Sequence, residues 1–205
     1  KSQQEKMENA ANKFFYDKNF DQWVKNFAIN LNDIWRDEPT KNLQPDSSGG
    51  KNEDSAIVLG GGPAIKKFNH LEILAKSDYK GTIICTDKIL VNALKAGITP
   101  EKFPKFYVVT IDTFDDIWTL YDHEIVRKYG KKINGIFSTL TDPCAIKTAR
   151  QNNIKIHWVH PLFDYNEGQK SFNHISALMV RSNDDSKGLP GIQTGGNVGT
   201  SCWFV

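Results

Sequence analysis

From residue 56 onward, short apolar runs rich in β-branched residues alternate with longer segments of helical periodicity. The runs predict buried strands at 56–59, 82–86, 106–111, 135–138 and 155–159. The segments between them predict helices at 64–77, 88–96, 115–129 and 142–152. Continuous apolar strands joined by helices are typical of βαβ units, in which a parallel sheet is covered on both faces. The alternation therefore predicts an α/β fold with a doubly wound, mostly parallel sheet.

The chain before this alternation has a different pattern. Apolar side chains at helical spacing over 13–36 predict an amphipathic helix that ends before Pro39, and the polar segment 39–55 is typical of a linker. We therefore expect a helical extension over 1–38, a linker over 39–55 and a domain over 56–205. The apolar stripe of the extension is expected to dock on the core, on a partner or on a second copy in a homo-oligomer. Val205 lies inside an apolar stretch, so we expect the natural chain to continue beyond it.

The bulk composition excludes several classes of protein. Hydrophobic residues make up 39% and charged residues 24% of the chain, which is typical of a globular domain, and a net charge of +2 does not favour nucleic-acid binding. There is no apolar run of roughly 18 residues, as a membrane span needs, and the polar beginning does not suggest a signal peptide. The three cysteines have neither disulfide-framework nor zinc spacing. We expect a cytoplasmic protein.

A glycine turn, Gly60-Gly61-Gly62-Pro63, directly follows the first predicted strand. Ligands of such sheets lie outside the carboxyl ends of the strands, and glycines let backbone N–H groups approach an anion at a helix N-terminus. The turn is not the dinucleotide GxGxxG motif, because the third residue after Gly62 is Ile65, and no Gly-Lys-Ser/Thr of a Walker A loop follows it. Phosphate binding is favoured over a plain tight turn.

Carboxylates follow the next two predicted strands. Asp87 ends the second strand, where an acidic residue of a nucleotide-binding fold contacts the ribose hydroxyls; a solvated carboxylate paired with Lys88 is an equally good interpretation. Asp112 ends the third strand and is our candidate ligand for a magnesium ion held against a diphosphate. Asp115 and Asp116 are interpreted as capping and first-turn residues of the following helix.

Two histidines flank the last predicted strand. His160 follows its carboxyl end and is a candidate acid or base, whereas His157 is interpreted as structural. Asp142 precedes Pro143 and is interpreted as a helix cap. A second glycine-rich turn comes near the end of the chain and is either a ligand-binding helix start or a hinge; its candidate ligand-binding residues are Gly195, Gly196 and Asn197.

Several of these segments together carry a family resemblance. They are 56–63 (AIVLGGGP), 84–87 (ICTD), 96–100 (AGITP), 107–112 (YVVTID) and 194–199 (TGGNVG). In this order they resemble the archaeal 6-hydroxymethylpterin diphosphokinase-like family, whose domain is shared with the motility-associated factor glycosyltransferases of bacterial flagellin modification. The resemblance covers about 55–205 and implies a Rossmann-like transferase that binds a nucleotide through the glycine turn. Its pterin branch moves diphosphate from ATP, with magnesium, to a 6-hydroxymethyl dihydropterin, and its glycosyltransferase branch uses a CMP-activated nonulosonic acid.

Three functions are compatible with these residues. Diphosphate transfer would use the glycine turn, Asp112 and Lys88. Glycosyl transfer would use His160 as the base for the acceptor hydroxyl. A nucleotide- or sugar-binding module without catalysis is the third, favoured by the docking helix and by departures from the family pattern: Ala64 replaces the usual serine, and 157–164 reads HWVHPLFD where the pterin enzymes have a His-Ala-His-Gly-Asp-Asn segment.

Overall fold

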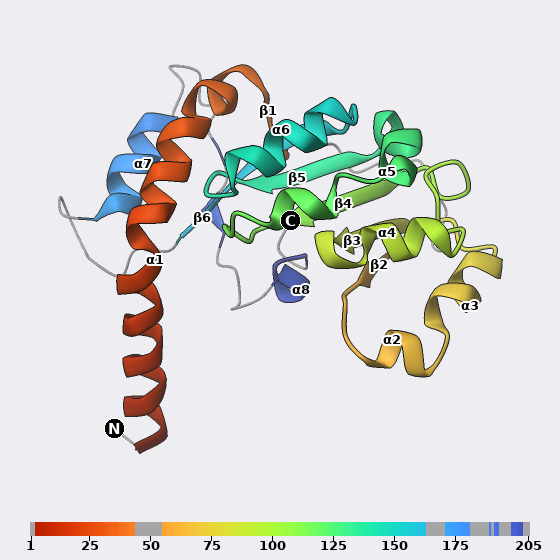
Figure 1. The fold of residues 1–205 in the computed structure, drawn as a ribbon, viewed down its shortest axis with the longest axis horizontal. Helices are drawn as coiled ribbons and strands as arrows, with labels where there is room; N and C mark the ends of the chain where they lie inside the picture. Colours follow the sequence, from red (N-terminus) through yellow and green to blue (C-terminus); the bar gives the residue numbers. More distant parts are fainter. Residues whose placement is uncertain are drawn as a thin grey trace.

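The computed structural model describes residues 3–43, 55–162, 171–180, 189, 191–192 and 198–202. Its centre is a sheet in which all described neighbouring strands pair in parallel (Figure 1). The sheet order is β1-β6-β5-β4-β3-β2, and β7 pairs with β6. The strands are β1 (Glu38–Pro39), β2 (Ala56–Leu59), β3 (Thr82–Thr86), β4 (Phe106–Thr110), β5 (Asn134–Ser138), β6 (Lys155–Pro161) and β7 (Gly191–Ile192). Helices flank the sheet, which confirms the predicted Rossmann-like α/β class.

The strands agree closely with the sequence prediction. From β2 to β6 they lie in the sheet in sequence order, so the carboxyl ends of consecutive strands are neighbours. The register confirms this, because Leu59 at the end of β2 lies opposite Cys85 near the end of β3. The main difference is in β6, which continues to Pro161, so that His160 lies within the strand.

Two predicted helices are broken. The segment 64–77 forms α2 (Ala64–Lys67) and α3 (His70–Lys76), separated at Asn69, which has a left-handed φ of 51°. Asparagine tolerates this conformation better than most residues, so it can end a helix where periodicity alone would continue it. The segment 115–129 forms the 3₁₀ helix η2 (Ile117–Leu120) and α5 (Glu124–Tyr129), separated by the extended residue His123. By contrast, α4 (Asp87–Lys95) and α6 (Pro143–Gln151) match their predictions within about a residue.

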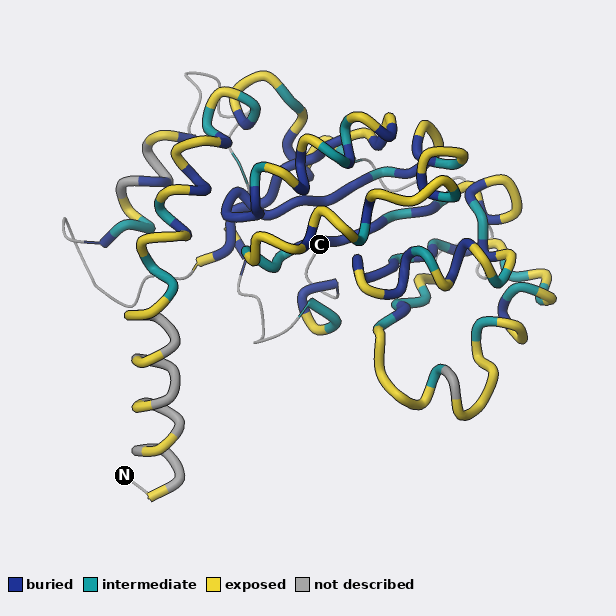
Figure 2. Tube along the Cα trace, in the orientation of Figure 1, coloured by how far each residue is buried: buried dark blue, intermediate teal, exposed yellow. Residues whose placement is uncertain are grey.

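Helix α1 (Gln3–Arg36) is longer than predicted and has two different halves. Its N-terminal half projects from the body of the molecule, where Met7 and Phe14 are 68% and 70% exposed (Figures 1 and 2). Its C-terminal half packs into the main hydrophobic core through Trp23, Phe27 and Ile34. The helix thus enters the same core as the sheet.

The sheet has an apolar cluster on each face. Val108 belongs to the main cluster and the adjacent Val109 to a second one, as expected from side chains that alternate along a strand. The second cluster also includes Ile192 of β7 and Cys202, which follows α8 (Val198–Ser201). The remaining elements are the 3₁₀ helices η1 (Thr40–Asn42) and η3 (Gly130–Lys132) and the helix α7 (Phe172–Val180). Within the described ranges, none of the helices combines the length and hydropathy needed to cross a bilayer.

Candidate functional site

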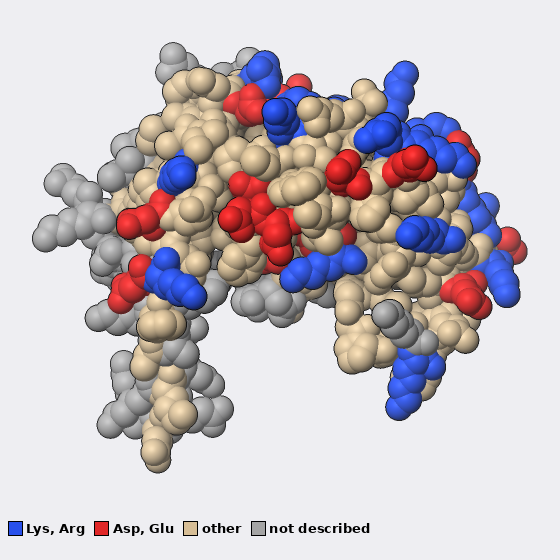
Figure 3. Space-filling model, in the orientation of Figure 1, with Lys and Arg blue, Asp and Glu red and all other residues tan. Residues whose placement is uncertain are grey.

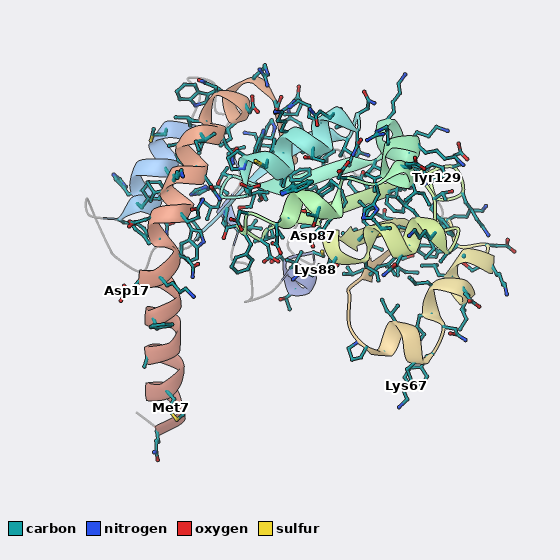
Figure 4. All side chains as sticks on the ribbon, viewed as in Figure 1. Met7, Asp17, Lys67, Asp87, Lys88 and Tyr129 are labelled. Atoms are coloured by element: carbon teal, nitrogen blue, oxygen red, sulfur yellow. The ribbon has the colours of Figure 1, made fainter. Side chains whose placement is uncertain are left out.

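The glycine turn after β2 lies against the first turn of α4. A Cβ atom added at Gly61 would lie 3.7 Å from the Cβ of Lys88, an ordinary van der Waals contact. Asp87 and Lys88 are the first residues of α4 and follow β3, the neighbour of β2 in the sheet (Figure 4). The fold therefore brings the predicted phosphate turn and the predicted ribose carboxylate to one edge of the sheet.

The glycines of this turn are not required by the packing of the described chain. A Cβ at Gly60 or Gly62 would meet no atom within 4 Å, and Gly97 is the one described glycine with a positive φ. By contrast, a Cβ at Gly135 in β5 would overlap the side chains of Phe137 and Ile154. The turn thus has open space where side chains would otherwise lie. Its glycines do not adopt the left-handed conformation that glycine allows.

The helix after the turn is too short to support an anion site by itself. Helix α2 has four residues, so it cannot build the dipole of a long helix. We expected this turn to open a helix that continued to residue 77, and that premise is wrong because of the break at Asn69. The positive charge beside the turn is instead that of Lys88.

Asp87 is a buried carboxylate rather than a solvated one. It is 1% exposed, and its Oδ1 accepts a hydrogen bond of 2.7 Å from the backbone N–H of Lys88. Its Oδ2 and the hydroxyl of Thr86 are buried without a hydrogen-bond partner in the described part of the chain. Burial raises the pKa of Asp87 to about 6, and the nearby charge of Asp112 adds to this effect. The N–H of Lys88 and the nearby hydroxyl of Thr110 lower it, but the hydrogen bond of the Thr110 hydroxyl is formed with Tyr121, so Oδ2 stays without a partner. A ligand hydroxyl or amine that reached Oδ2 would supply the missing donor.

Lys88 forms its ion pair with Asp112, not with Asp87. The Nζ atom of Lys88 lies 3.5 Å from Oδ2 of Asp112, and the two side chains are 64% and 26% exposed. An accessible cation and an accessible carboxylate therefore face each other beside the glycine turn. Over the described residues, no three His, Cys, Asp or Glu side chains are grouped so that they could hold a metal ion by themselves. A magnesium ion here would depend on ligand phosphates, as is usual for this metal.

A cleft of about 370 Å³ opens beside this pair. Lys88, Phe114, Asp115 and Asp116 line it together with residues of η2. Asp116 occupies the capping position of η2, but its side chain makes no capping hydrogen bond. Figure 3 shows acidic side chains gathered near the middle of this face of the molecule. The cleft therefore offers carboxylates to a molecule that carries hydrogen-bond donors or positive charge.

Beneath the site lies a buried polar pair that the sequence did not reveal. The hydroxyls of Thr110 and Tyr121 are 2.6 Å apart, and both residues are fully buried. Burial is the main cause of the raised pKa of Tyr121, and the charge of Asp87 contributes. Asp87 also contributes to the raised pKa of Cys202, about 12, which is chiefly due to burial. Cys202, directly after α8, thus lies near Asp87. The predicted ligand residues just before this helix, Gly195, Gly196 and Asn197, lie outside the described residues.

Helix α1 holds the loops that follow β4 and β5. The side-chain amide of Asn26 donates to the carbonyls of Leu140 (2.9 Å) and Thr113 (3.3 Å), and the indole N–H of Trp23 donates to the hydroxyl of Thr113 (3.1 Å). One turn further along, the amide of Asn30 donates to the carbonyls of Thr139 and Thr141, at 3.1 and 2.8 Å. Both asparagines are almost completely buried. The sequence signal was two asparagines four residues apart on the apolar side of an amphipathic helix.

Both ring nitrogens of His160 are hydrogen-bonded. Nδ1 lies 2.7 Å from the hydroxyl of Thr139, and Nε2 lies 2.8 Å from the hydroxyl of Ser176 on α7. The ring is 3% exposed, and burial lowers its pKa to about 4. Because Ser176 also donates to the carbonyl of Asn173, a consistent arrangement has His160 neutral and donating from Nε2. This geometry does not favour a role in proton transfer.

The remaining predicted residues lie further from the turn. Asp142 caps α6 by accepting a hydrogen bond of 3.1 Å from the backbone N–H of Ala145, with Pro143 in the first turn, as predicted. His157 is 1% exposed, and its Nδ1 lies 3.3 Å from the carbonyl of Gly135. Of the predicted residues, the fold thus brings together the glycine turn, Asp87, Lys88 and Asp112.

Comparison with known proteins gives one result at the level of the family. The model of the 6-hydroxymethylpterin diphosphokinase MptE-like family matches residues 25–205. The chain belongs to the MptE-like family. The match begins inside α1 and so includes Asn26 and Asn30, upstream of the segments that carry the resemblance in the sequence. Membership supports a transferase-like role at the level of the family. No curated protein and no solved structure is significantly similar to the chain.

Proposed function

We propose that this MptE-like protein is a nucleotide-dependent transferase that moves diphosphate from ATP to a hydroxymethyl acceptor. The observation that carries the proposal is the convergence at the carboxyl ends of β2, β3 and β4. There an open glycine turn contacts Lys88, and Lys88 pairs with Asp112. Phosphoryl transfer depends mainly on positioning and on neutralising charge, so it needs few side chains of this kind.

In this proposal each residue has a separate task. The backbone of Gly60–62 and the ammonium of Lys88 bind the phosphates, and Asp87 accepts a hydrogen bond from a hydroxyl or amine of a bound ligand through its unpaired Oδ2. The acceptor oxygen then bonds to the β-phosphorus, and the bond between this phosphorus and the oxygen bridging to the α-phosphate breaks. AMP leaves with the bonding electrons, and the proton of the acceptor hydroxyl is released to water.

Asp112 is the residue suited to hold magnesium. Its carboxylate is accessible and lies beside the proposed phosphate site, and one carboxylate together with phosphates is a common way to bind this metal. When bound, magnesium would neutralise charge on the phosphates. Lys88 would then exchange its ion pair with Asp112 for contacts with the phosphates.

Thermal-shift measurements with ATP, CMP and CDP, each with and without magnesium, test the proposal. We expect a magnesium-dependent shift with ATP that is lost in Asp112→Ala and kept in Asp122→Ala, which removes an exposed carboxylate from outside the site. Formation of AMP from ATP should depend on addition of 6-hydroxymethyl-7,8-dihydropterin.

Other outcomes would replace the proposal. A shift with CMP that needs no metal would favour glycosyl transfer, for which the hydrogen-bonded His160 is a poor base. A nucleotide shift without AMP formation would favour a binding module. The absence of any nucleotide shift would refute the nucleotide site itself.

A further inference from the structure

A second, apolar cavity lies on the other side of the glycine turn. It has a volume of about 720 Å³ and lies between β2 and the α2–α3 segment. Its walls are mainly aliphatic and include Ile57, Leu59, Ile65, Ile73 and Leu74. Its described lining contains no Asp, Glu, Lys or Arg. Cavities of this size with apolar walls and a few polar groups are typical of small-molecule sites.

The glycine turn forms one wall of this cavity. Gly60 and Gly62 line it, and a Cβ at either position would meet no protein atom within 4 Å. Gly61 faces the other way, toward Lys88, which lines the acidic cleft. The turn therefore separates an apolar compartment from an acidic one, and phosphates on the turn would lie between the two.

We propose that the apolar cavity binds the base of the nucleotide and that the acidic cleft is left for the acceptor. This inference rests on the proposed function, because it assigns the two ends of a ligand whose phosphates lie on the turn. A nucleobase is flat and uncharged, so its faces suit aliphatic walls. Its polar edge can hydrogen-bond to His70, because the hydroxyls of Ser77 and Tyr79, which also line the cavity, already bond to Leu74 and Ser55.

The sequence argues against an occupant from the preceding part of the chain. Segment 44–54 (QPDSSGGKNED) contains no apolar side chain other than Pro45 and carries several charges. Burying such a segment against aliphatic walls would cost free energy through desolvation of its polar groups. An uncharged ring has a smaller cost, because only its polar edge must be desolvated.

The test compares ATP with inorganic tripolyphosphate, which lacks the base, in the presence of magnesium. Ala64 lines the cavity and is exposed, so Ala64→Phe fills the cavity without disturbing the core. Lys67→Phe is the matched control, because Lys67 lies on the same short helix but does not line the cavity. Calorimetry of the wild-type protein should show ATP binding at least about tenfold tighter than tripolyphosphate, which corresponds to about 1.4 kcal/mol.

We expect Ala64→Phe to bind ATP only as tightly as tripolyphosphate, with tripolyphosphate affinity unchanged, whereas Lys67→Phe keeps the preference for ATP. Ile73→Asn gives a second variant that should fold, because Ile73 is 64% exposed. Its uncharged amide in the wall should weaken binding of the base, and therefore of ATP, without repelling tripolyphosphate.

Three results would overturn the inference and leave the proposed function standing. They are full ATP affinity in both cavity variants, equal wild-type affinity for ATP and tripolyphosphate, or a change of oligomeric state in Ala64→Phe, which would identify the cavity as an interface between copies. Failure of the wild-type protein to bind either compound would instead refute the proposed function.

Discussion

At the β6 side of the sheet, α1 enters the core and its buried amides hydrogen-bond to two loops, whereas at the β2 edge the chain leaves open space. Asn26 and Asn30 together donate to four loop carbonyls, and His160 is hydrogen-bonded through both ring nitrogens. At the opposite edge, a Cβ atom at Gly60 or Gly62 would meet no other atom within 4 Å. A cavity there separates β2 from α3.

This difference separates residues that stabilise the fold from residues that are available to a ligand. Buried polar groups with partners stabilise a unique arrangement, whereas a buried group without a partner costs stability. The Oδ2 atom of Asp87 is of the second kind, and it lies at the edge with the open turn. Such a cost is commonly found at functional sites.

The largest loss of stability should come from a substitution on the β6 side of the sheet. Asn30→Ala leaves the carbonyls of Thr139 and Thr141 without their donor, so we expect a loss of about 2–4 kcal/mol in the free energy of unfolding. Urea denaturation followed by circular dichroism measures this. Asn32→Ala is the control: Asn32 is exposed on the same helix, and the change should be within about 0.5 kcal/mol. Equal effects at the two positions would show that the buried amide is not a stabilising contact.

The pH dependence of stability should also reveal the buried His160. Its pKa is lowered from 6.5 to about 4 in the folded chain, so the unfolded chain binds more protons between these values and stability falls as the pH is lowered. We expect this residue to account for a loss of about 2–3 kcal/mol between pH 6.5 and pH 4. Urea titrations across this range should show a smaller loss in His160→Asn and an unchanged loss in His123→Gln, which removes an exposed imidazole. Matching pH profiles for wild type and His160→Asn would contradict the buried neutral ring.

Asp87 should make stability depend on pH in the opposite direction from His160. Its pKa is raised from 3.8 to about 6 on folding, so the folded chain binds more protons in this window and stability decreases as the pH rises through it. Asp87→Asn should therefore stabilise the protein by about 1–2 kcal/mol at pH 7.5 and have little effect at pH 4. Thermal and urea unfolding at both pH values measure this. Asp112→Asn, which breaks an exposed ion pair, should change stability by less than about 0.5 kcal/mol. A destabilised Asp87→Asn at pH 7.5 would show that the carboxylate has a structural partner.

The smallest effect on stability is expected at the glycine turn. Gly62→Ala should change the free energy of unfolding by less than about 0.5 kcal/mol, because the added methyl group meets no atom and the backbone is not left-handed. The same variant should weaken magnesium-dependent ATP binding. Gly135→Ala, in which the methyl group overlaps Phe137 and Ile154, should cost about 1–3 kcal/mol. Similar stability losses in the two variants would remove the distinction between the open turn and the packed interior of the sheet.

The strands, and the placement of the candidate site residues at one edge of the sheet, were predictable for a local reason. Apolar runs bounded by turn residues specify strands, and in a parallel sheet the residues after consecutive strands share an edge. This is why Asp87, Lys88 and Asp112 could be named before the fold was seen. The breaks in two helices were missed because Asn69 and His123 interrupt a periodicity that the apolar residues continue.

The roles of individual polar residues were less predictable. The sequence left open whether Asp87 pairs with Lys88, and it made His160 a candidate acid or base. The fold instead buries Asp87, directs Lys88 to Asp112, and places His160 between Thr139 and Ser176. Partners that come from distant parts of the chain leave no local pattern.

By itself, the sequence determined the α/β class, the strand positions and the family, because these depend on patterns within a few residues or on motifs in order. The tertiary structure decided that α1 belongs to the core, that Gly60 and Gly62 face open space, and which carboxylate is buried. Burial and hydrogen-bond partners depend on which elements pack together, and those contacts join residues that are far apart in the chain.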